Sequence, residues 1–433
     1  MDQYEPSRKL LAFIEKSPSV FHAVANLKEE LELAGFQELE ENRQWVLQHG
    51  KGYFVTRNDS SLIAFRVPER ELQYFHLTAA HSDSPCFKLK PSCEILVDHQ
   101  YVKLNTEGYG GMLMGPWLDR PLSVAGRAVV RRGNQLKKVL VHIDRDLLLI
   151  PNVAIHMNRD ANNGKKWNAQ TDLLPLYGGA DSMETFSIEI ANAAGARVED
   201  LLDYDLFLYN RMPGRIWGAQ NEFISSRALD DLQCSWALMQ GFLQAEGGEI
   251  RRNALAACCI FDNEETGSLS AQGADSTFLT DVLERIRETM DITAGEWRKA
   301  IAEGFMISAD NAHAVHPNHP ELADPTNRPY LNQGIVIKYH ANQKYTTDSI
   351  TASMFRTICQ EADVPVQTYT NRSDQAGGST LGNISNAHLS IRSVDIGLPQ
   401  LAMHSPYETA GADDTEYLIR AIRKFYERHV VIR

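Results

Sequence analysis

The pattern of hydrophobic and polar positions predicts helices and buried strands in the first part of the chain. In "LLAFIEKS" and "VFHAVANLKEELELAGF", apolar side chains recur every three or four positions, which predicts two amphipathic helices within the first forty residues. The runs "SLIAFRV" and "YFHLTAAHSDS" are short and nearly continuously apolar, as expected of buried strands. The second of these strands is expected to end at His81, where the sequence becomes polar.

The same alternation of strands and helices resumes after Phe223. Residues 227–246 place apolar side chains on one helical face. Further strands are predicted at residues 253–261, 304–309, 334–340 and 389–397, and further helices at residues 278–290, 349–362 and about 411–429. This alternation predicts an α/β fold with a mixed, mostly parallel sheet flanked by helices on both faces.

Residues 92–222 have a different texture. Short β-like runs such as "CEILVDH", "RAVVRRG" and "KKVLVHID" are separated by polar loops such as "HMNRDANNGKKWNAQ". We therefore predict a β-rich domain at residues 92–222, inserted into a discontinuous α/β domain formed by residues 1–91 and 223–433.

The composition excludes several classes of protein. Of the 433 residues, 43% are hydrophobic, and the net charge of −13 argues against nucleic acid or an anionic membrane surface as a partner. No apolar run reaches the roughly 18 residues of a membrane span, and the first residues do not resemble a secretory signal, so a cytoplasmic protein is expected. The six cysteines form no CxxC motif, which argues against a disulfide framework and a thiolate zinc site.

Two adjacent glutamates, Glu264 and Glu265, follow the apolar run "ALAACCI" in the stretch "FDNEETGS". Neighbouring carboxylates repel each other and gain nothing from burial unless a positive charge lies beside them. Taken alone, the pair is compatible with a solvated strand end.

Four other strand or loop ends offer carboxylate or imidazole groups. They are His81 and Asp83 in "TAAHSDSP", Asp230 and Asp231 in "SSRALDDL", Asp310 and His313 in "SADNAHAVHPNH", and His404 in "LAMHSPYETAG". Each has an ordinary structural explanation, such as acidic residues favoured at a helix N-terminus. Together they are typical of a zinc, cobalt or manganese site, in which a shared carboxylate can hold two ions and so supply the missing positive charge.

These motifs, in this order, resemble the aspartyl aminopeptidase family over almost the whole chain. The resemblance rests on "AHSDSP", "RALDDL", "DNEETGS", "SADNAHAVHPN" and "AMHS". It implies a cytosolic exopeptidase with two zinc ions, for which cobalt or manganese can substitute. The expected reaction is removal of an N-terminal residue, preferably Asp or Glu, from peptides with a free N-terminus. It also implies that the inserted domain mediates dimerisation and that the dimers assemble into a homo-oligomer, a dodecamer.

The resemblance assigns roles to individual residues of the metal site. The zinc ligands are expected to be His81, Asp230, Glu265, Asp310 and His404, with Asp230 bridging the two ions. Glu264 is expected to act as the general base, which takes a proton from the attacking water and passes it to the leaving amine. Asp83 is expected to hold the ring of His81, and Asp231 to be a neighbour rather than a ligand.

Three further residues match substrate-binding positions of the family. His313 and Lys338 are expected near the substrate, and Lys338 would pair with an acidic side chain or a terminal carboxylate. His156 is expected to reach the site of a neighbouring subunit, although it could equally be an ordinary loop histidine. The segment "GYGGMLMGPWLDRP" differs in detail from the Trp-rich version in the family, so no role is assigned to it.

Two alternative functions are compatible with the same residues. A deacylase or carboxypeptidase with two metal ions would recognise a substrate carboxylate instead of a free amine. A scaffold protein without activity could keep the fold, although retention of Glu264 argues against that alternative.

Overall fold

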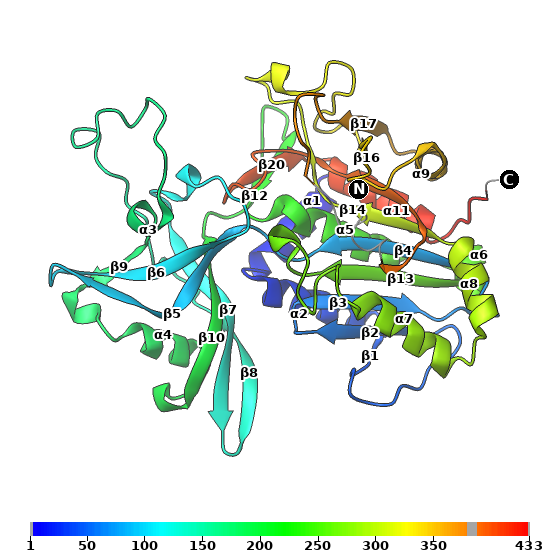
Figure 1. Cartoon of the computed structure of the whole chain (residues 1–433), viewed down its shortest axis with the longest axis horizontal. Coiled ribbons are helices and arrows are strands. Elements are labelled where there is room, and N and C mark those ends of the chain that lie inside the picture. The colour runs from blue at the N-terminus through cyan, green and yellow to red at the C-terminus, as the bar shows by residue number, and fades with distance from the viewer. Residues whose placement is uncertain (1–2, 379–387, 432–433) are drawn as a thin grey trace.

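The computed structural model describes residues 3–378 and 388–431 and divides into an α/β part and a β-rich part. In Figure 1, the β-rich part formed by the middle of the chain lies to the left of the layered α/β part. None of the helices among the described residues is long and apolar enough to cross a membrane.

A nine-stranded sheet forms the centre of the α/β part, with the order β1-β2-β3-β13-β4-β14-β18-β16-β17. Its strands are β1 (Gln37–Glu38), β2 (Gly52–Arg57), β3 (Ser61–Arg66), β4 (Tyr74–His81), β13 (Ala254–Phe261), β14 (Phe305–Ala309), β16 (Ile335–Tyr339), β17 (Val366–Thr370) and β18 (Arg392–Gly397). The pairs β1–β2, β13–β4, β4–β14, β14–β18 and β16–β17 are parallel, and the remaining three are antiparallel. The predicted mixed, mostly parallel sheet is thus confirmed.

Helices cover both faces of this sheet. One layer contains α1 (Glu5–Lys16), α2 (Val20–Leu33), α5 (Leu229–Gln244), α9 (Ser349–Glu361) and α11 (Asp414–Phe425). The opposite layer contains α7 (Phe278–Thr289) and α8 (Ala294–Ala302), and α6 (Gly248–Asn253) precedes β13.

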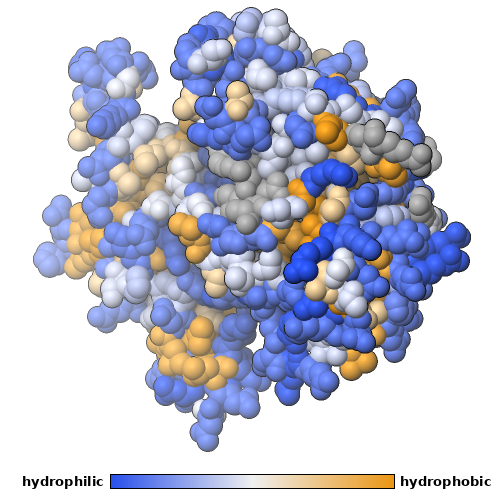
Figure 2. Space-filling model, turned by 45° about the vertical axis from the view of Figure 1, so that its right-hand side comes forward, coloured by the Kyte–Doolittle hydropathy of each residue, from blue (hydrophilic) through white to orange (hydrophobic). Residues whose placement is uncertain are grey.

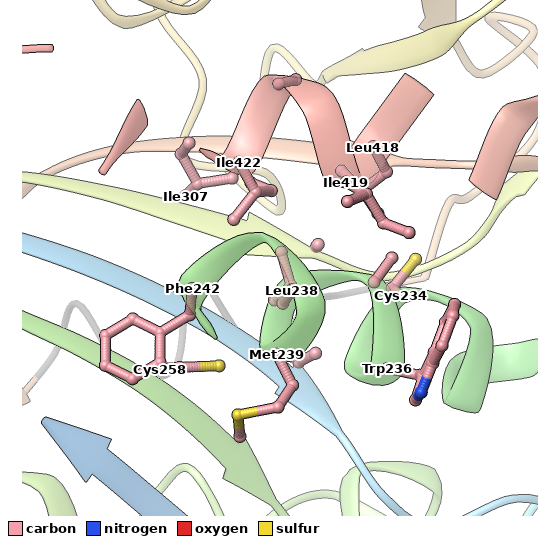
Figure 3. Packing of buried hydrophobic residues seen from close by; sticks show 14 of the residues in the cluster. Cys234, Trp236, Leu238, Met239, Phe242, Cys258, Ile307, Leu418, Ile419 and Ile422 are labelled. Carbon is pink, nitrogen blue, oxygen red and sulfur yellow. The ribbon is translucent and has the colours of Figure 1, made fainter. Parts of the chain in front are cut away.

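Side chains on the central strands alternate between these two layers, because successive residues of a strand point to opposite faces. Cys258 packs in the first layer and its neighbour Cys259 in the second, so the adjacent cysteines of β13 lie in separate hydrophobic cores. Figure 3 shows Cys258 near Phe242 and Met239 of α5. Both β4 and β13 are buried along their whole length, which fixes their positions firmly.

The β-rich part is a six-stranded sheet with the order β8-β7-β10-β5-β6-β9. Its elements are β5 (Cys86–Val97), β6 (Tyr101–Tyr109), β7 (Leu122–Arg132), β8 (Gln135–His142), β9 (Leu176–Gly179), β10 (Leu201–Asn210), α3 (Ala169–Asp172) and α4 (Phe186–Ala193). It has its own hydrophobic core, in which Phe87, Val124 and Leu206 are fully buried. The division of the chain at residues 92 and 222 stays a prediction; β5 itself begins at Cys86.

The third sheet was not predicted from the sequence. It has five strands in the order β11-β12-β20-β19-β15. Its short strands are β11 (Arg215–Trp217), β12 (Phe223–Ser226), β15 (Ala312–His313), β19 (Pro399–Leu401) and β20 (Glu408–Gly411). In this sheet Ser226 lies opposite Glu408. The pairing therefore brings the segment before Asp230 next to the segment after His404.

The polar residues predicted from the sequence follow the carboxyl ends of neighbouring strands, on the same side of the large sheet. His81 at the end of β4 is paired with Phe261 at the end of β13, and Ala309 at the end of β14 is paired with Ile396 of β18. Because these strands are parallel, their carboxyl ends meet at the same edge, where ligands bind in open α/β sheets.

Candidate metal centre

One cavity collects most of the sequence-predicted site residues. Its lining includes His81, Asp230, Glu264, Glu265, Asp310, His313, Lys338 and His404. Asp83 lies directly behind His81: its backbone carbonyl is 3.1 Å and its Oδ1 is 3.4 Å from the His81 Nδ1 atom. His156 is exposed in the loop between β8 and α3 and is not part of this lining.

Sharp turns at strand ends place the acidic groups. After β13, Asn263 adopts a left-handed conformation with φ of 62°, which asparagine tolerates better than most residues. The turn leads into the 3-10 helix η4 (Glu264–Thr266), so that the glutamate pair stands beside the end of β4. Asp230 and Asp231 have non-helical backbone angles at the start of α5, which directs both side chains inward, and both are buried.

Asp230 has the geometry of a bridging carboxylate. Its Oδ1 atom lies 3.7 Å from His81 Nε2, and its Oδ2 atom lies 3.2 Å from His404 Nε2. Each oxygen therefore faces a different histidine. The Oδ1 atom is buried and has no hydrogen-bond partner among the described residues.

The possible ligand atoms form two main groups that share Asp230. One contains His81, Asp230, Asp231 and Asp310, and the other contains Asp230, Glu265 and His404; in each, the atoms lie within 4.8 Å of one another. The buried Oε1 of Glu265 and Oδ1 of Asp231 also have no hydrogen-bond partner in the described part of the chain. Imidazole nitrogens with unpartnered carboxylate oxygens are a donor set that fits zinc.

Electrostatics show that the cavity has an excess of negative charge. Burial, together with repulsion from neighbouring carboxylates, raises the pKa values of Asp231, Asp310 and Glu265 above their ordinary values. Burial also opposes ionisation of Asp230, but the hydrogen bond with His404 and the charge of His81 outweigh it and lower the Asp230 pKa. Positive ions between these groups would compensate the remaining charge.

Glu264 belongs to neither of the two groups that share Asp230, but with His81 and Glu265 it forms a third group of possible ligands. Burial and repulsion from neighbouring carboxylates raise the pKa of Glu264 to about 7, against the opposing effect of His81. Asp83 holds this pair in place: its Oδ1 accepts the backbone N–H of Glu264 and its Oδ2 that of Glu265, both at 3.2 Å. Asp83 thus fixes both glutamates and the ring of His81.

Lys338 is a buried cation on the wall of the cavity. Its Nζ atom donates a hydrogen bond to the backbone carbonyl of Asn311 at 2.8 Å and lies 3.5 Å from Asp310 Oδ2. His313 and Tyr369 also line the cavity, and the centroids of their rings are 6.1 Å apart. Both positions agree with a location beside the substrate.

Glu408 is a residue that sequence reasoning missed. It is buried in β20, and its Oε2 atom accepts the backbone N–H of Asp230 at 2.9 Å while Oε1 accepts that of His404 at 2.7 Å. One carboxylate therefore ties together the two segments that carry Asp230 and His404. The only sequence signal was a glutamate four positions after His404, within the otherwise uncharged run "SPYETAG".

The chain is similar to known proteins over nearly its full length. Residues 13–426 match the family described as "Aminopeptidase I zinc metalloprotease (M18)". "Probable M18 family aminopeptidase 2" of Clostridium novyi is 45% identical over 428 residues, covering 97% of this chain and 98% of the relative. The protein of the same name in Pseudomonas aeruginosa is 41% identical over 430 residues, covering 98% of both chains.

Solved structures show the same fold. The chain matches the "Cryo-EM structure of the Ape4 and Nbr1 complex" with a TM-score of 0.94 and 35% identity, over 98% of this chain and 85% of that one. It matches the "Structure of Chaetomium thermophilum mApe1" with a TM-score of 0.88 and 28% identity, over 98% of each chain.

We predict that Glu408→Gln weakens zinc binding by roughly 10- to 100-fold, as expected when a residue that orients metal ligands is changed. The amide nitrogen would face a backbone N–H of Asp230 or His404 and would displace that segment. Asp414→Asn is a matched control, since buried Asp414 also accepts two backbone N–H groups, from Asn332 and Gly334, away from the cavity. Competition with a chelator measures the affinity, and denaturant unfolding measures the stability.

Both substitutions should lower the free energy of unfolding by a similar amount, on the order of 1–3 kcal/mol. Only Glu408→Gln should change zinc affinity. Equal zinc affinities for the two variants would show that Glu408 only stabilises the fold.

Proposed function

The chain belongs to the M18 family of zinc aminopeptidases, and from this membership we propose that it removes acidic N-terminal residues from peptides with two zinc ions. It is accordingly a zinc-dependent aminopeptidase and a hydrolase. The family favours this activity over the deacylase and over the inactive scaffold that the sequence left open. The number of ions, the roles of individual residues, the preference for acidic residues and the assembly are the parts that we propose.

The single observation that carries the two-ion proposal is the position of Asp230 between His81 and His404, with one carboxylate oxygen facing each. His81, Asp230 and Asp310 would hold one ion, and Asp230, Glu265 and His404 the other. Bound there, zinc would polarise the scissile carbonyl and lower the pKa of the attacking water, as cobalt or manganese would in its place.

The chain's own residues would then handle the proton. Glu264, which lines the cavity beside the ligand groups, would accept the proton of the attacking water and pass it to the leaving amine. Asp83 Oδ1 accepts the backbone N–H of Glu264, which orients the glutamate, and the same oxygen lies beside the His81 ring. His313, on the cavity wall, is placed to stabilise negative charge that develops on the carbonyl oxygen.

We predict that removal of metal abolishes cleavage of amino-acid p-nitroanilides and that zinc, cobalt or manganese restores it. Glu264→Gln should lower kcat by at least about 100-fold, because a general base typically contributes 10²- to 10⁴-fold. The same variant should retain zinc, measured by elemental analysis after dialysis. Full activity of Glu264→Gln would refute the base assignment, and equal cleavage of an N-acetylated peptide would favour the deacylase instead.

The preference for acidic residues is proposed from the family resemblance and from Lys338. Its ammonium group is fixed at the wall of the cavity by Asn311, and burial fails to neutralise it, because Asp310 and other acidic groups raise its pKa. With the ions compensating the ligand carboxylates, Lys338 would attract an acidic substrate side chain.

We predict that Lys338→Met lowers kcat/KM for Asp-p-nitroanilide by at least about tenfold more than for Ala-p-nitroanilide, because a charge-assisted hydrogen bond contributes about 1.5–3 kcal/mol. The ratio of the two values is the readout, since a general disturbance of the neighbouring Asp310 affects both substrates alike. An unchanged ratio would exclude Lys338 as the determinant. Wild-type preference for Ala or Leu would contradict the acidic preference itself.

We further propose that the chain assembles into dimers through the inserted domain and that dimers form a dodecamer. Figure 2 shows hydrophobic patches on the surface of the molecule. Large apolar side chains are exposed along the inserted domain, including Leu136, Leu140 and Ile188, and Met157 next to His156 is 82% exposed. An exposed loop of this kind is suited to an interface, where His156 would reach a neighbouring site.

We predict that His156→Ala and Glu264→Gln are each strongly impaired, but that co-expressed chains regain about a quarter of wild-type activity if dimers form at random. In a mixed dimer, one site combines an intact Glu264 with an intact His156 from the neighbour. Sedimentation should give a mass of twelve chains for the dodecamer, or of two chains for the isolated dimer. Absence of recovery in verified mixed oligomers would show that His156 does not act in trans, and a monomer would contradict the assembly.

A further inference from the structure

The segment Tyr109–Leu113 belongs to the inserted domain, yet it runs along the metal centre. It begins at the last residue of β6 and contains the two glycines for which the sequence suggested no role. Contacts from this segment reach both the glutamate pair and His404.

Tyr109 reaches the glutamate pair through Asp83. Its hydroxyl donates a hydrogen bond to Asp83 Oδ2 at 2.7 Å and accepts one from the Asn263 side chain at 2.8 Å. The Asp83 carboxylate thus receives three donors: two backbone N–H groups from Glu264 and Glu265, and the Tyr109 hydroxyl. Of these, only the hydroxyl comes from the inserted domain.

The following residues contact the second group of ligands. Leu113 N–H donates to the His404 carbonyl at 3.0 Å, and the backbone carbonyl of Gly111 lies near enough to the His404 ring to contribute to its raised pKa. Histidines that bind metals usually donate their other ring N–H to such an acceptor, which fixes the ring orientation. Gly110 lies against Glu265: a Cβ atom there would be 3.0 Å from Glu265 Cβ.

We propose that the Tyr109–Leu113 segment positions the general base and the second group of zinc ligands, with Tyr109 as the positioning residue for Glu264. This inference rests on the proposed function. It means that the inserted domain contributes to the active site of its own chain, independently of any part it has in assembly. Tyr109 itself would touch neither substrate nor zinc.

The hydroxyl matters because Asp83 Oδ2 accepts only two donors among the described residues, and the Tyr109 hydroxyl at 2.7 Å is closer than the Glu265 N–H at 3.2 Å. Without the hydroxyl, Oδ2 keeps only the longer hydrogen bond from Glu265, so the carboxylate and the glutamate backbone attached to it are held less firmly. Small displacements of a general base are costly in rate. Tyr109→Phe should therefore lower kcat by roughly tenfold, at the lower end of the effect of residues that orient a catalytic group, while KM changes by less than about twofold.

Tyr204→Phe is the matched control for this substitution. Tyr204 lies in β10 of the same sheet, and its hydroxyl donates to the backbone carbonyls of Lys90 at 2.9 Å and Pro91 at 2.8 Å instead of to a residue of the metal centre. Both variants lose one tyrosine hydroxyl of the β-rich part together with the hydrogen bonds that it makes. Only Tyr109→Phe should lower kcat, measured with the p-nitroanilide that the wild type cleaves best.

Zinc affinity provides a second test that does not depend on activity. Gly110→Ala would press on Glu265, whereas Gly133→Ala would meet nothing within 4 Å. Both glycines have positive φ, 72° and 62°, so both substitutions carry a similar backbone cost. Chelator competition should show zinc affinity at least about tenfold weaker for Gly110→Ala, and unchanged affinity for Gly133→Ala.

The inference is overturned if Tyr109→Phe keeps the kcat of Tyr204→Phe, or if Gly110→Ala binds zinc as tightly as Gly133→Ala. These outcomes are distinct from failure of the proposed function, which would appear as an inactive wild type. In that event the comparison of the two glycine variants would still decide whether this segment positions the zinc ligands.

Discussion

Burying carboxylates without enough positive charge is the constraint on which the rest of the structure depends. Asp230, Asp231 and Glu265 lie close together, and each has a buried oxygen without a hydrogen-bond partner among the described residues. Uncompensated charges of this kind are among the most costly features that a folded protein can contain. Metal binding removes that cost, so zinc affinity and the stability of this edge of the sheet are thermodynamically linked.

The fold fixes the segments that carry His81, the glutamate pair, Asp230 and His404 by strand pairing and by hydrogen bonds to their backbone. The buried strands β4 and β13 hold His81 and the glutamate pair, and the small third sheet holds the segments of Asp230 and His404. Asp83 and Glu408 then connect neighbouring segments through backbone N–H groups. The carboxylates of Asp83 and Glu408 accept backbone N–H groups of the ligand segments. The side-chain oxygens of the ligand candidates themselves are therefore available to bind metal.

The sequence predicted the large sheet because its strands are long, apolar and separated by amphipathic helices. The predicted helix at residues 227–246 and the strand at residues 253–261 are found as α5 and β13. The ligand candidates were also predictable, since each stands at a strand end or in a distinctive motif. The third sheet was not, because strands of two to four residues are too short for a periodic pattern.

Contacts across the chain were beyond the reach of sequence reasoning for a different reason. Glu408 and Asp230 are separated by 178 positions, and Tyr109 of the β-rich sheet is 154 positions from Asn263, which follows β13 of the large sheet. Such partners leave no local periodicity or spacing. They become visible only when the strands that carry them are placed side by side.

The order of these residues along the chain has a consequence for biosynthesis. His81 comes first among the ligand candidates and His404 comes last, followed by Glu408 and by helix α11. A chain still growing on the ribosome therefore lacks one of the three members of the second ligand group until all other ligand candidates have been made. The second ligand group can therefore assemble only after the His404 segment has been synthesised and has paired with the segment that precedes Asp230.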